Sequence, residues 1–130
     1  MLVTAVPLIA RAQPALLASG QFLVAAQEGV IVGAGGWSMQ APGGRPGARG
    51  VGHIRHVATD PDYLRRGVGR MLLQQVLFQA RASGMMQMQC QSTLTAVPFY
   101  QAMGFVQQAE IEIALRPGIP FRAVFMVAQL

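Results

Sequence analysis

A turn with two glycines lies between a predicted strand and a predicted helix, and this order limits the folds open to the chain. Residues 51–59, VGHIRHVAT, have the pattern of a strand. Residues 67–83 have the apolar spacing of a helix that is buried along one side and ends at Gly84. The residues that carry this spacing are Val68, Leu72, Val76 and Ala80, with Met71 and Phe78 beside them. Strand followed directly by helix is typical of α/β proteins.

Alternation along the 51–59 strand predicts which side chains share a face. One face receives Val51, His53, Arg55, Val57 and Thr59, and the other receives Gly52, Ile54, His56 and Ala58. We therefore expect the side chains of His53 and Arg55 to point into the same cleft as those of Val57 and Thr59.

The other predicted elements complete a sheet covered by helices. Residues 4–19 have helical spacing broken by Pro14, and residues 41–50 are a Gly- and Pro-rich loop. A helix capped by Thr95 runs to Met103. Strands are predicted at 22–26 and 30–37, which form a hairpin around Glu28 and Gly29, at 86–91, from Phe105, and at 110–115 and 121–129, which form a second hairpin. This order predicts a mixed α/β fold.

Length and composition favour one packed domain over residues 1–130. Two domains would each be too short to bury a useful core, and 52% hydrophobic with 12% charged residues is the opposite of a disordered composition. No apolar run is long enough to span a membrane, and Arg11 interrupts the stretch where a signal peptide needs an apolar core. We expect a cytoplasmic protein with no membrane partner.

Residue counts also limit the cofactors and partners. One cysteine and two histidines are a poor ligand set for a metal, so no metal is predicted. Cys90 alternates with Met86 and Met88 on an apolar face and is expected to pack there rather than carry an acyl group. The net charge of +5, from ten arginines against five acids, favours an anionic partner. The net charge alone is compatible with three such partners: nucleic acid, anionic lipid and a phosphorylated cofactor.

The turn before the predicted helix has the chemistry of a diphosphate site. Gly67 and Gly69 let a ligand approach the backbone, and the free amides of a helix N-terminus attract negative charge. Arg65, Arg66 and Arg70 add positive charge around the turn. Taken alone, the pattern is equally compatible with a tight turn and solvated arginines.

Two segments together resemble the signatures of the GNAT family of acetyl-CoA dependent N-acetyltransferases. They are HVATDPDYLRRGVGRMLL, residues 56–73, and AVPFYQAMGF, residues 96–105. The resemblance runs from Phe22 to the C-terminus. It implies a mostly antiparallel sheet whose central pair of parallel strands is splayed, with helices on its faces and acetyl-CoA bound in the splay.

The resemblance also implies a set of donor-binding residues. Val57, Ala58 and Thr59 match the strand that pairs with the pantetheine arm of acetyl-CoA. The pyrophosphate turn matches Arg65, Arg66, Gly67, Val68, Gly69 and Arg70. Leu64 departs from the Gln or Arg that usually opens this turn, which removes one polar side chain but leaves the backbone amides.

Two side chains match catalytic positions of the family. Tyr100 matches a tyrosine that protonates the departing thiolate of coenzyme A, and the alternative is a tyrosine packed on the core. His53 falls where some members carry a glutamate base, and histidine can do that work near neutral pH. The alternative for His53 is a histidine hydrogen-bonded within the sheet.

The activity implied by the resemblance is direct transfer of an acetyl group to a primary amine of a small molecule or peptide, with both substrates bound. A non-catalytic acyl-CoA-binding or sensing module of the same fold is the alternative. Nucleic-acid binding is not expected, because stacking aromatics and a binding motif are absent. Only about twenty residues precede the first hairpin, so we expect the family's opening strand and first helix to be shortened or missing and a homodimer to complete the acceptor side.

Overall fold

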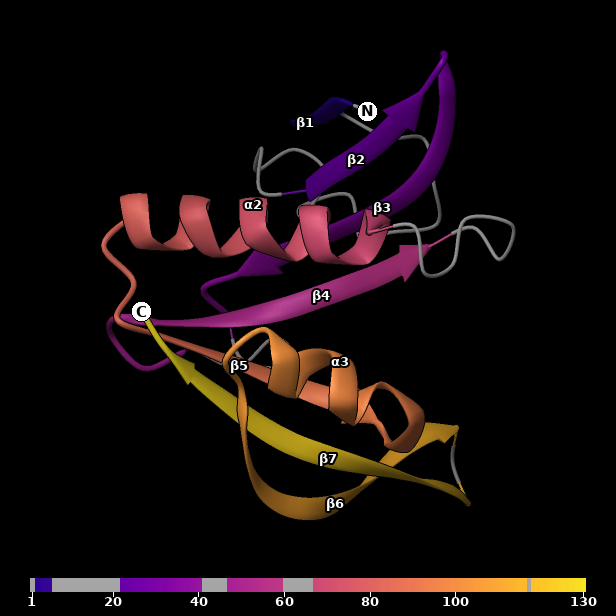
Figure 1. Ribbon diagram of the computed structural model, residues 1–130. Coiled ribbons are helices and arrows are strands. Elements are labelled where there is room, and N and C mark those ends of the chain that lie inside the picture. Colours follow the sequence, from indigo (N-terminus) through magenta and orange to yellow (C-terminus); the bar gives the residue numbers. More distant parts are fainter. Residues whose placement is uncertain (1, 6–21, 41–46, 60–66, 117) are drawn as a thin grey trace.

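The computed structural model of the protein describes residues 2–5, 22–40, 47–59, 67–116 and 118–130 (Figure 1). Seven strands in this part of the chain form one sheet. They are β1 (Leu2–Ala5), β2 (Phe22–Gln27), β3 (Val30–Ser38), β4 (Val51–Thr59), β5 (Gln87–Thr93), β6 (Val106–Arg116) and β7 (Ile119–Gln129). The described helical elements are α2 (Val68–Ala82), the 3₁₀ turn η3 (Leu94–Ala96) and α3 (Val97–Ala102).

The sheet opens between its two central strands. Its order is β1-β2-β3-β4-β5-β7-β6, and β4 and β5 are the parallel pair among otherwise antiparallel neighbours. The β4–β5 register ends where His53 lies opposite Gln89, whereas β5 stays paired with β7 as far as Thr93. The C-terminal halves of β4 and β5 therefore diverge. The predicted mixed sheet with a splayed central parallel pair is confirmed.

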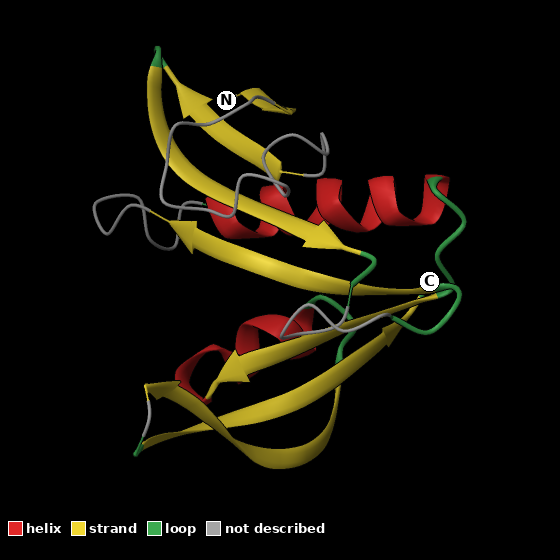
Figure 2. Ribbon diagram, turned by 180° about the vertical axis from the view of Figure 1, so that it is seen from behind, coloured by secondary structure: helices red, strands yellow, loops and turns green. Residues whose placement is uncertain are grey.

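Both described helices cover the same face of the sheet. α2 packs on β3 and β4, α3 lies against β5 and β6, and the view from behind shows the strands in front of both helices (Figures 1 and 2). The helix predicted at 67–83 is confirmed, and its buried residues are Val68, Leu72, Leu73, Val76 and Ala80.

Two apolar side chains expected in the core are exposed. Phe78 of α2 is 65% exposed because it lies outside the stripe that the helix buries against the sheet. Met86 is 72% exposed because β5 begins only at Gln87. Met88 and Cys90 are buried as predicted.

β4 contains one residue more than β3 along their shared edge. Ala34 lies opposite Ala58 and Gly36 lies opposite Arg55, so two residues of β4 face the single residue between Ala34 and Gly36. This is a β-bulge, and an extra residue reverses the alternation of side chains beyond it. β4 therefore consists of two halves with opposite side-chain orientation.

The C-terminal half of β4 points toward the helices. A Cβ atom on Gly33 would lie 2.7 Å from Val68 of α2, so Gly33 faces the helical side of the sheet. Thr59 is opposite Gly33 and shares this face. A Cβ atom on Gly35 would lie 3.2 Å from a methyl group of Val57, which places Val57 on the helical side as well.

The N-terminal half of β4 points away from the helices. His53 lies opposite Ser38 and Arg55 lies opposite Gly36, and these two β3 positions alternate with Gly33, which faces the helices. The prediction that His53 and Arg55 share a face with Val57 and Thr59 was wrong, because strict alternation assumes a strand without a bulge.

The chain begins with a strand rather than a helix. β1 pairs antiparallel with β2, and Thr4 and Ala5, assigned to a helix from the sequence, lie opposite Val24 and Leu23. The helix prediction was therefore wrong at Thr4 and Ala5, whereas an opening strand of four residues lies within the expectation that this strand is shortened or missing. Residues 6–19, the rest of the predicted helix, lie outside the described residues, as do residues 41–46 of the predicted loop.

Both predicted hairpins are present, with differences at their ends. Glu28 and Gly29 have φ angles of 52° and 79°, the positive values that a tight two-residue turn between β2 and β3 requires. At the C-terminus, β6 is one strand of eleven residues rather than two separate strands, and β-bulges interrupt its register with β7. No described helix is long and apolar enough to cross a membrane.

The short helix begins differently from the prediction. Thr95 lies inside η3, and the residue that precedes α3 is Ala96, which makes no side-chain cap. Pro98 occupies the first turn of α3 as expected, because proline needs no hydrogen-bond acceptor there. Gly104, with a φ angle of 96°, ends the segment.

Candidate functional site

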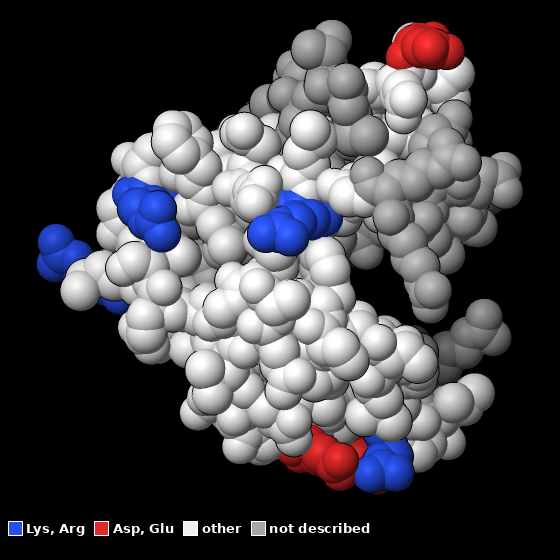
Figure 3. Space-filling model, in the orientation of Figure 1, with Lys and Arg blue, Asp and Glu red and all other residues white. Residues whose placement is uncertain are grey.

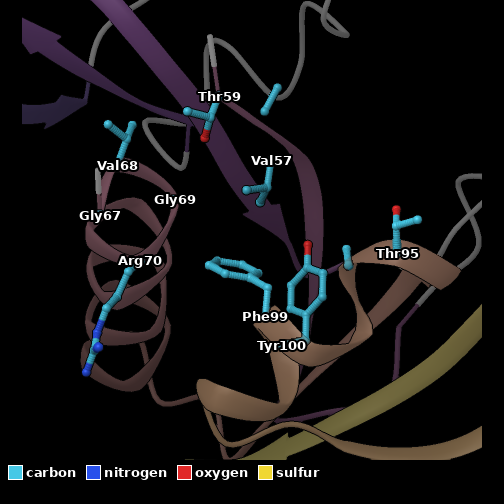
Figure 4. A pocket seen from close by; sticks show the side chains of 11 residues that line it. Val57, Thr59, Gly67, Val68, Gly69, Arg70, Thr95, Phe99 and Tyr100 are labelled. Carbon is cyan, nitrogen blue, oxygen red and sulfur yellow. The ribbon is translucent and has the colours of Figure 1, made fainter. Parts of the chain in front are cut away.

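A pocket of about 580 Å³ lies where the first turn of α2, the η3–α3 segment and the end of β4 meet (Figure 4). Its walls come from three segments that are far apart in the sequence. The lining residues are Val57, Ala58, Thr59, Gly67, Val68, Gly69, Arg70, Thr95, Ala96, Phe99 and Tyr100. The structure thus brings the two signature segments of the sequence to one cavity.

The first turn of α2 presents unused backbone amides to this pocket. The first hydrogen bond of the helix runs from the amide of Met71 to the carbonyl of Gly67, at 3.0 Å. The amides of Val68, Gly69 and Arg70 precede that bond and have no acceptor within the helix. Among the described residues no side chain caps this end, and Gly67 takes a left-handed conformation with a φ angle of 79°. The positive end of the helix dipole is therefore available to an anion.

A small residue at position 69 keeps the pocket wall thin. A Cβ atom there would lie 3.4 Å from two ring atoms of Phe99 and 3.6 Å from the hydroxyl of Thr59. A side chain longer than alanine would enter the space between α2, α3 and β4. The turn and the cavity fit an elongated ligand with a diphosphate group.

The arginines around the turn are only partly described. Arg70 is exposed, and its side chain runs along the outside of α2, away from Tyr100 (Figure 4). Arg65 and Arg66 lie outside the described residues. Among the described residues, the anion-binding groups of this turn are therefore the backbone amides of Val68, Gly69 and Arg70.

Tyr100 forms the opposite end of the pocket. Its ring is 9% exposed and packs edge-on against Phe99 and Phe105, with centroid distances of 5.2 and 5.4 Å. Its hydroxyl points toward Val57 of β4 (Figure 4). Burial, and secondly the neighbouring Cys90, raise the pKa of Tyr100 to about 12. The hydroxyl is therefore protonated at neutral pH and can donate a proton.

Cys90 lines a crevice together with Tyr100 and is unsuited to covalent chemistry. It is 4% exposed, and burial raises the pKa of its thiol to about 12. Since the thiolate is the nucleophilic form, almost none of the reactive species exists near pH 7. These properties agree with the packing role predicted for Cys90.

A crevice between the diverging halves of β4 and β5 continues from the pocket. This space of about 250 Å³ shares Val57, Ala96 and Tyr100 with the main pocket. It shares Ile54 and Cys90 with a third cavity of about 200 Å³, described below. Tyr100 therefore borders both the main pocket and the splay.

His53 does not line the main pocket. It lies in the third cavity, on the sheet face away from the helices, together with Arg55. Burial, and secondly the positive charge of Arg55, lower the pKa of His53 below 6.5, so the imidazole is neutral at pH 7. The bulge in β4, which has no clear sequence signature, accounts for this separation.

The sequence interpretation missed three residues of the main pocket: Thr95, Ala96 and Phe99. Phe99 could have been predicted from the sequence. It precedes Tyr100 near the start of a predicted helix, and side chains at the start of a helix can face the same cavity. Thr95 and Ala96 line the pocket because η3 turns back across the end of β5.

Comparison with known proteins agrees with this geometry. A model of the "Acetyltransferase (GNAT) family" matches residues 5–105. Glucosamine 6-phosphate N-acetyltransferase from Trypanosoma brucei brucei is 35% identical over 77 residues. The matched segment is 59% of this chain and 52% of the Trypanosoma protein, so the chain spans about half the length of that relative.

Solved structures have the same fold. A GCN5-related N-acetyltransferase from Rhodopseudomonas palustris superposes with a TM-score of 0.71 and 26% identity, covering 90% of this chain and 68% of that protein. The structure of yncA from Salmonella typhimurium, which contains its cofactor acetyl-CoA, gives a TM-score of 0.68 at 23% identity, covering 84% of this chain and 64% of that protein. The second likeness concerns the fold alone. Because the family model matches most of the chain, the protein belongs to the acetyltransferase (GNAT) family.

Proposed function

We propose that the protein transfers the acetyl group of acetyl-CoA to a primary amine by direct attack while both substrates are bound. One observation carries this proposal: a single cavity has unused helix amides at one end and a protonated tyrosine beside the sheet splay at the other. Acetyl-CoA would supply the activated thioester. The diphosphate and the sulfur lie at different points along the acetyl-CoA molecule. In the same way, the helix amides and Tyr100 lie at different ends of the cavity.

The donor would be held mainly by backbone groups. The amides of Val68, Gly69 and Arg70 would bind the diphosphate. The exposed edge of β4 at Val57, Ala58 and Thr59 lacks a β5 partner because the register ends at His53, so its amides and carbonyls are available to the amide groups of the pantetheine arm.

Tyr100 would act as the general acid. Its hydroxyl would donate a proton to the sulfur as the carbon–sulfur bond breaks and the carbon–nitrogen bond forms. A pKa of about 12 keeps this proton in place at neutral pH. Without such a donor, the product would leave as the less stable thiolate.

His53 would act as the base on the other side of the splay. A neutral imidazole can accept a proton, and the lowered pKa keeps His53 neutral at pH 7. The acid and the base would then lie on opposite sides of the sheet, joined by the crevice between β4 and β5. This arrangement allows the amine and the departing thiol to lie on opposite sides of the acetyl carbon.

The acceptor would be a primary amine of a small molecule or peptide. The name of the Trypanosoma relative identifies its acceptor as glucosamine 6-phosphate, which makes that compound the first acceptor to test. A cytoplasmic location and a homodimer stay predictions.

The test combines donor binding with turnover. Wild type and Tyr100→Phe are titrated with acetyl-CoA by calorimetry, and release of coenzyme A thiol is then measured with a panel of primary amines. The ring contacts of Tyr100 survive in phenylalanine, so binding should persist while kcat falls about 100-fold, the lower range for loss of a general acid. Donor binding without turnover for any amine would instead identify a non-catalytic acyl-CoA-binding module.

A further inference from the structure

The crevice between β4 and β5 is closed at one end, where the two strands meet. Their last paired positions are His53 and Gln89, so Ile54 and Cys90 are the first residues of each strand beyond the paired region. Both line the crevice, which has a volume of about 250 Å³. Ile54 and Cys90 therefore form the floor of the crevice.

A bound donor would direct its acyl group toward this floor. In the proposed binding mode the diphosphate lies at the first turn of α2, and the pantetheine arm follows β4 from Thr59 to Val57. β4 continues from Val57 toward Ile54, and the hydroxyl of Tyr100 points at Val57 (Figure 4). A sulfur atom beside Tyr100 therefore leaves the acyl group between Val57 and the floor.

The crevice is larger than an acetyl group requires. A water-sized group, such as the methyl of an acetyl group, needs only about 10–15 Å³ of accessible cavity volume, whereas the crevice has about 250 Å³. The reacting amine would enter from the His53 cavity, with which the crevice shares Gln91, and would add only its nitrogen and the neighbouring carbon. Room therefore remains at the floor for further methylene groups.

Small side chains keep this space open. Cys90 and Ser92 are 4% and 2% exposed and belong to the buried face of β5. Ala96 of η3 also lines the crevice. Since protein interiors are closely packed and contain few voids, unfilled volume beside three small side chains is a feature that a ligand can use. A leucine at any of these positions would occupy it.

The crevice is also uncharged. No charged residue lines it in the part of the chain that the structure describes, and burial raises the pKa of the Cys90 thiol to about 12, which keeps the thiol protonated. The Ser92 hydroxyl donates to the Thr93 carbonyl at 2.7 Å and needs no partner from a ligand. Figure 3 shows uncharged residues over α3 on the helical face. A carboxylate would lose its hydration here without compensation, whereas a neutral acyl chain would not.

We propose that the floor formed by Ile54 and Cys90 admits acyl groups longer than acetyl, so that the protein transfers short neutral acyl groups such as propionyl and butyryl as well as acetyl. The inference rests on the proposed acetyl transfer and names the class of donor for the same site. The acyl carbon would exchange its bond to sulfur for a bond to nitrogen. The amine proton would pass to His53, and Tyr100 would protonate the sulfur. Ile54 and Cys90 are thus assigned as residues that determine acyl length.

The kinetic test compares donors that differ only in acyl length. Wild type receives acetyl-, propionyl- or butyryl-CoA with an amine that it acetylates, and release of coenzyme A thiol is measured. A pocket that ended at the acetyl methyl would reject each extra methylene by about 10–200-fold. We expect butyryl-CoA to keep at least about one tenth of the kcat/KM of acetyl-CoA. A lower value would overturn the inference and leave acetyl transfer intact.

Succinyl-CoA tests the neutral class of donor. Its acyl chain has the length of butyryl but ends in a carboxylate. Its kcat/KM should be more than about tenfold lower than that of butyryl-CoA, because the uncharged crevice has nothing to replace the water around the carboxylate. A smaller difference, or a preference for succinyl-CoA, would contradict the assignment of a neutral acyl chain.

Variants at the floor should change the preferred acyl length in opposite directions. Ile54→Ala enlarges the floor and should raise the ratio of hexanoyl to acetyl kcat/KM at least about tenfold, and Cys90→Leu should lower the ratio of butyryl to acetyl by a similar factor. Ile113→Ala is the matched control, because Ile113 is a half-buried isoleucine of β6 that lines none of the three cavities. An unchanged ratio in whichever floor variant folds, or an equal change in Ile113→Ala, would contradict the assignment.

A binding experiment separates the inference from turnover. Calorimetry without an amine gives the Kd of acetyl-CoA and of butyryl-CoA for wild type. Full burial of two further methylene groups corresponds to about fifteenfold tighter binding, so butyryl-CoA should bind at least about threefold more tightly. Tighter binding without turnover of any donor would support the acyl site while refuting transfer. Equal or weaker binding of butyryl-CoA would refute the site, whether or not acetyl is transferred.

Discussion

The ring of Phe99 in α3 lies against the backbone of Gly69 in α2, at the point where a Cβ atom would be 3.4 Å from two ring carbons. The two signature segments of the chain therefore touch through a position that has no side chain. An aspartate at position 69 would fill this space and place a negative charge beside the free amides of the first turn.

We accordingly expect Gly69→Asp to abolish acetyl-CoA binding. Calorimetry should detect no heat of binding, and thermal unfolding should lose the ~2.7 kcal/mol of stabilisation expected for wild type with ligand at a hundredfold excess over Kd. Gln75→Asp adds the same charge at an exposed position of α2 and should bind like wild type. Binding by Gly69→Asp at wild-type affinity would show that the donor does not use this turn.

His53 should make stability depend on pH. Its pKa in the folded protein lies below 6.5, so the unfolded chain binds more protons between the two values and stability falls as pH decreases through that window. Urea unfolding at pH 7.5 and 5.5 should show a larger loss for wild type than for His53→Gln. Equal losses in the two proteins would mean that the pKa of His53 is not lowered by folding.

Cys90 should react slowly with alkylating agents. A thiol pKa of about 12 leaves roughly one part in ten thousand as thiolate at pH 8, on the order of a thousandfold less than an unperturbed thiol. Mass spectrometry should therefore find little iodoacetamide adduct on the folded protein and rapid labelling in urea. Fast labelling of the native protein would show that the thiol is accessible and ionised.

Gly33→Ala should destabilise the sheet–helix contact. The new Cβ atom would lie 2.7 Å from Val68 and 3.0 Å from Leu72, both fully packed in the core. Overpacking of this kind costs about 1–3 kcal/mol in the free energy of unfolding. Gly69→Ala, whose nearest contact would be 3.4 Å, is the control and should cost less. Similar stabilities of the two variants in urea would contradict this packing.

The sequence predicts the parts of the fold that depend on local spacing. The α2 stripe of Val68, Leu72, Val76 and Ala80, the β2–β3 turn and the β4 boundaries agree with the structure because each depends on neighbouring residues. Residues 67–70 of the glycine turn and Tyr100 line one pocket, and their roles in donor binding and catalysis stay predictions.

The features that the sequence did not predict depend on pairing between strands. The bulge in β4 exists because of the register with β3, and β1 is a strand because β2 offers it an edge. Alternation within one segment contains no information about either. The placement of His53 was misjudged for this reason, although its assignment to β4 was correct.

The bulge in β4 makes the strand sensitive to length as well as to residue type. Deleting one residue at position 56 would leave Val57 alone opposite Gly35 and remove the bulge, so both halves of the strand would keep their present faces. Deleting one residue within either half would instead shift the neighbouring side chains by one position and therefore to the other face of the sheet. The bulge is thus the place where β4 can lose a residue without exchanging its buried and exposed side chains.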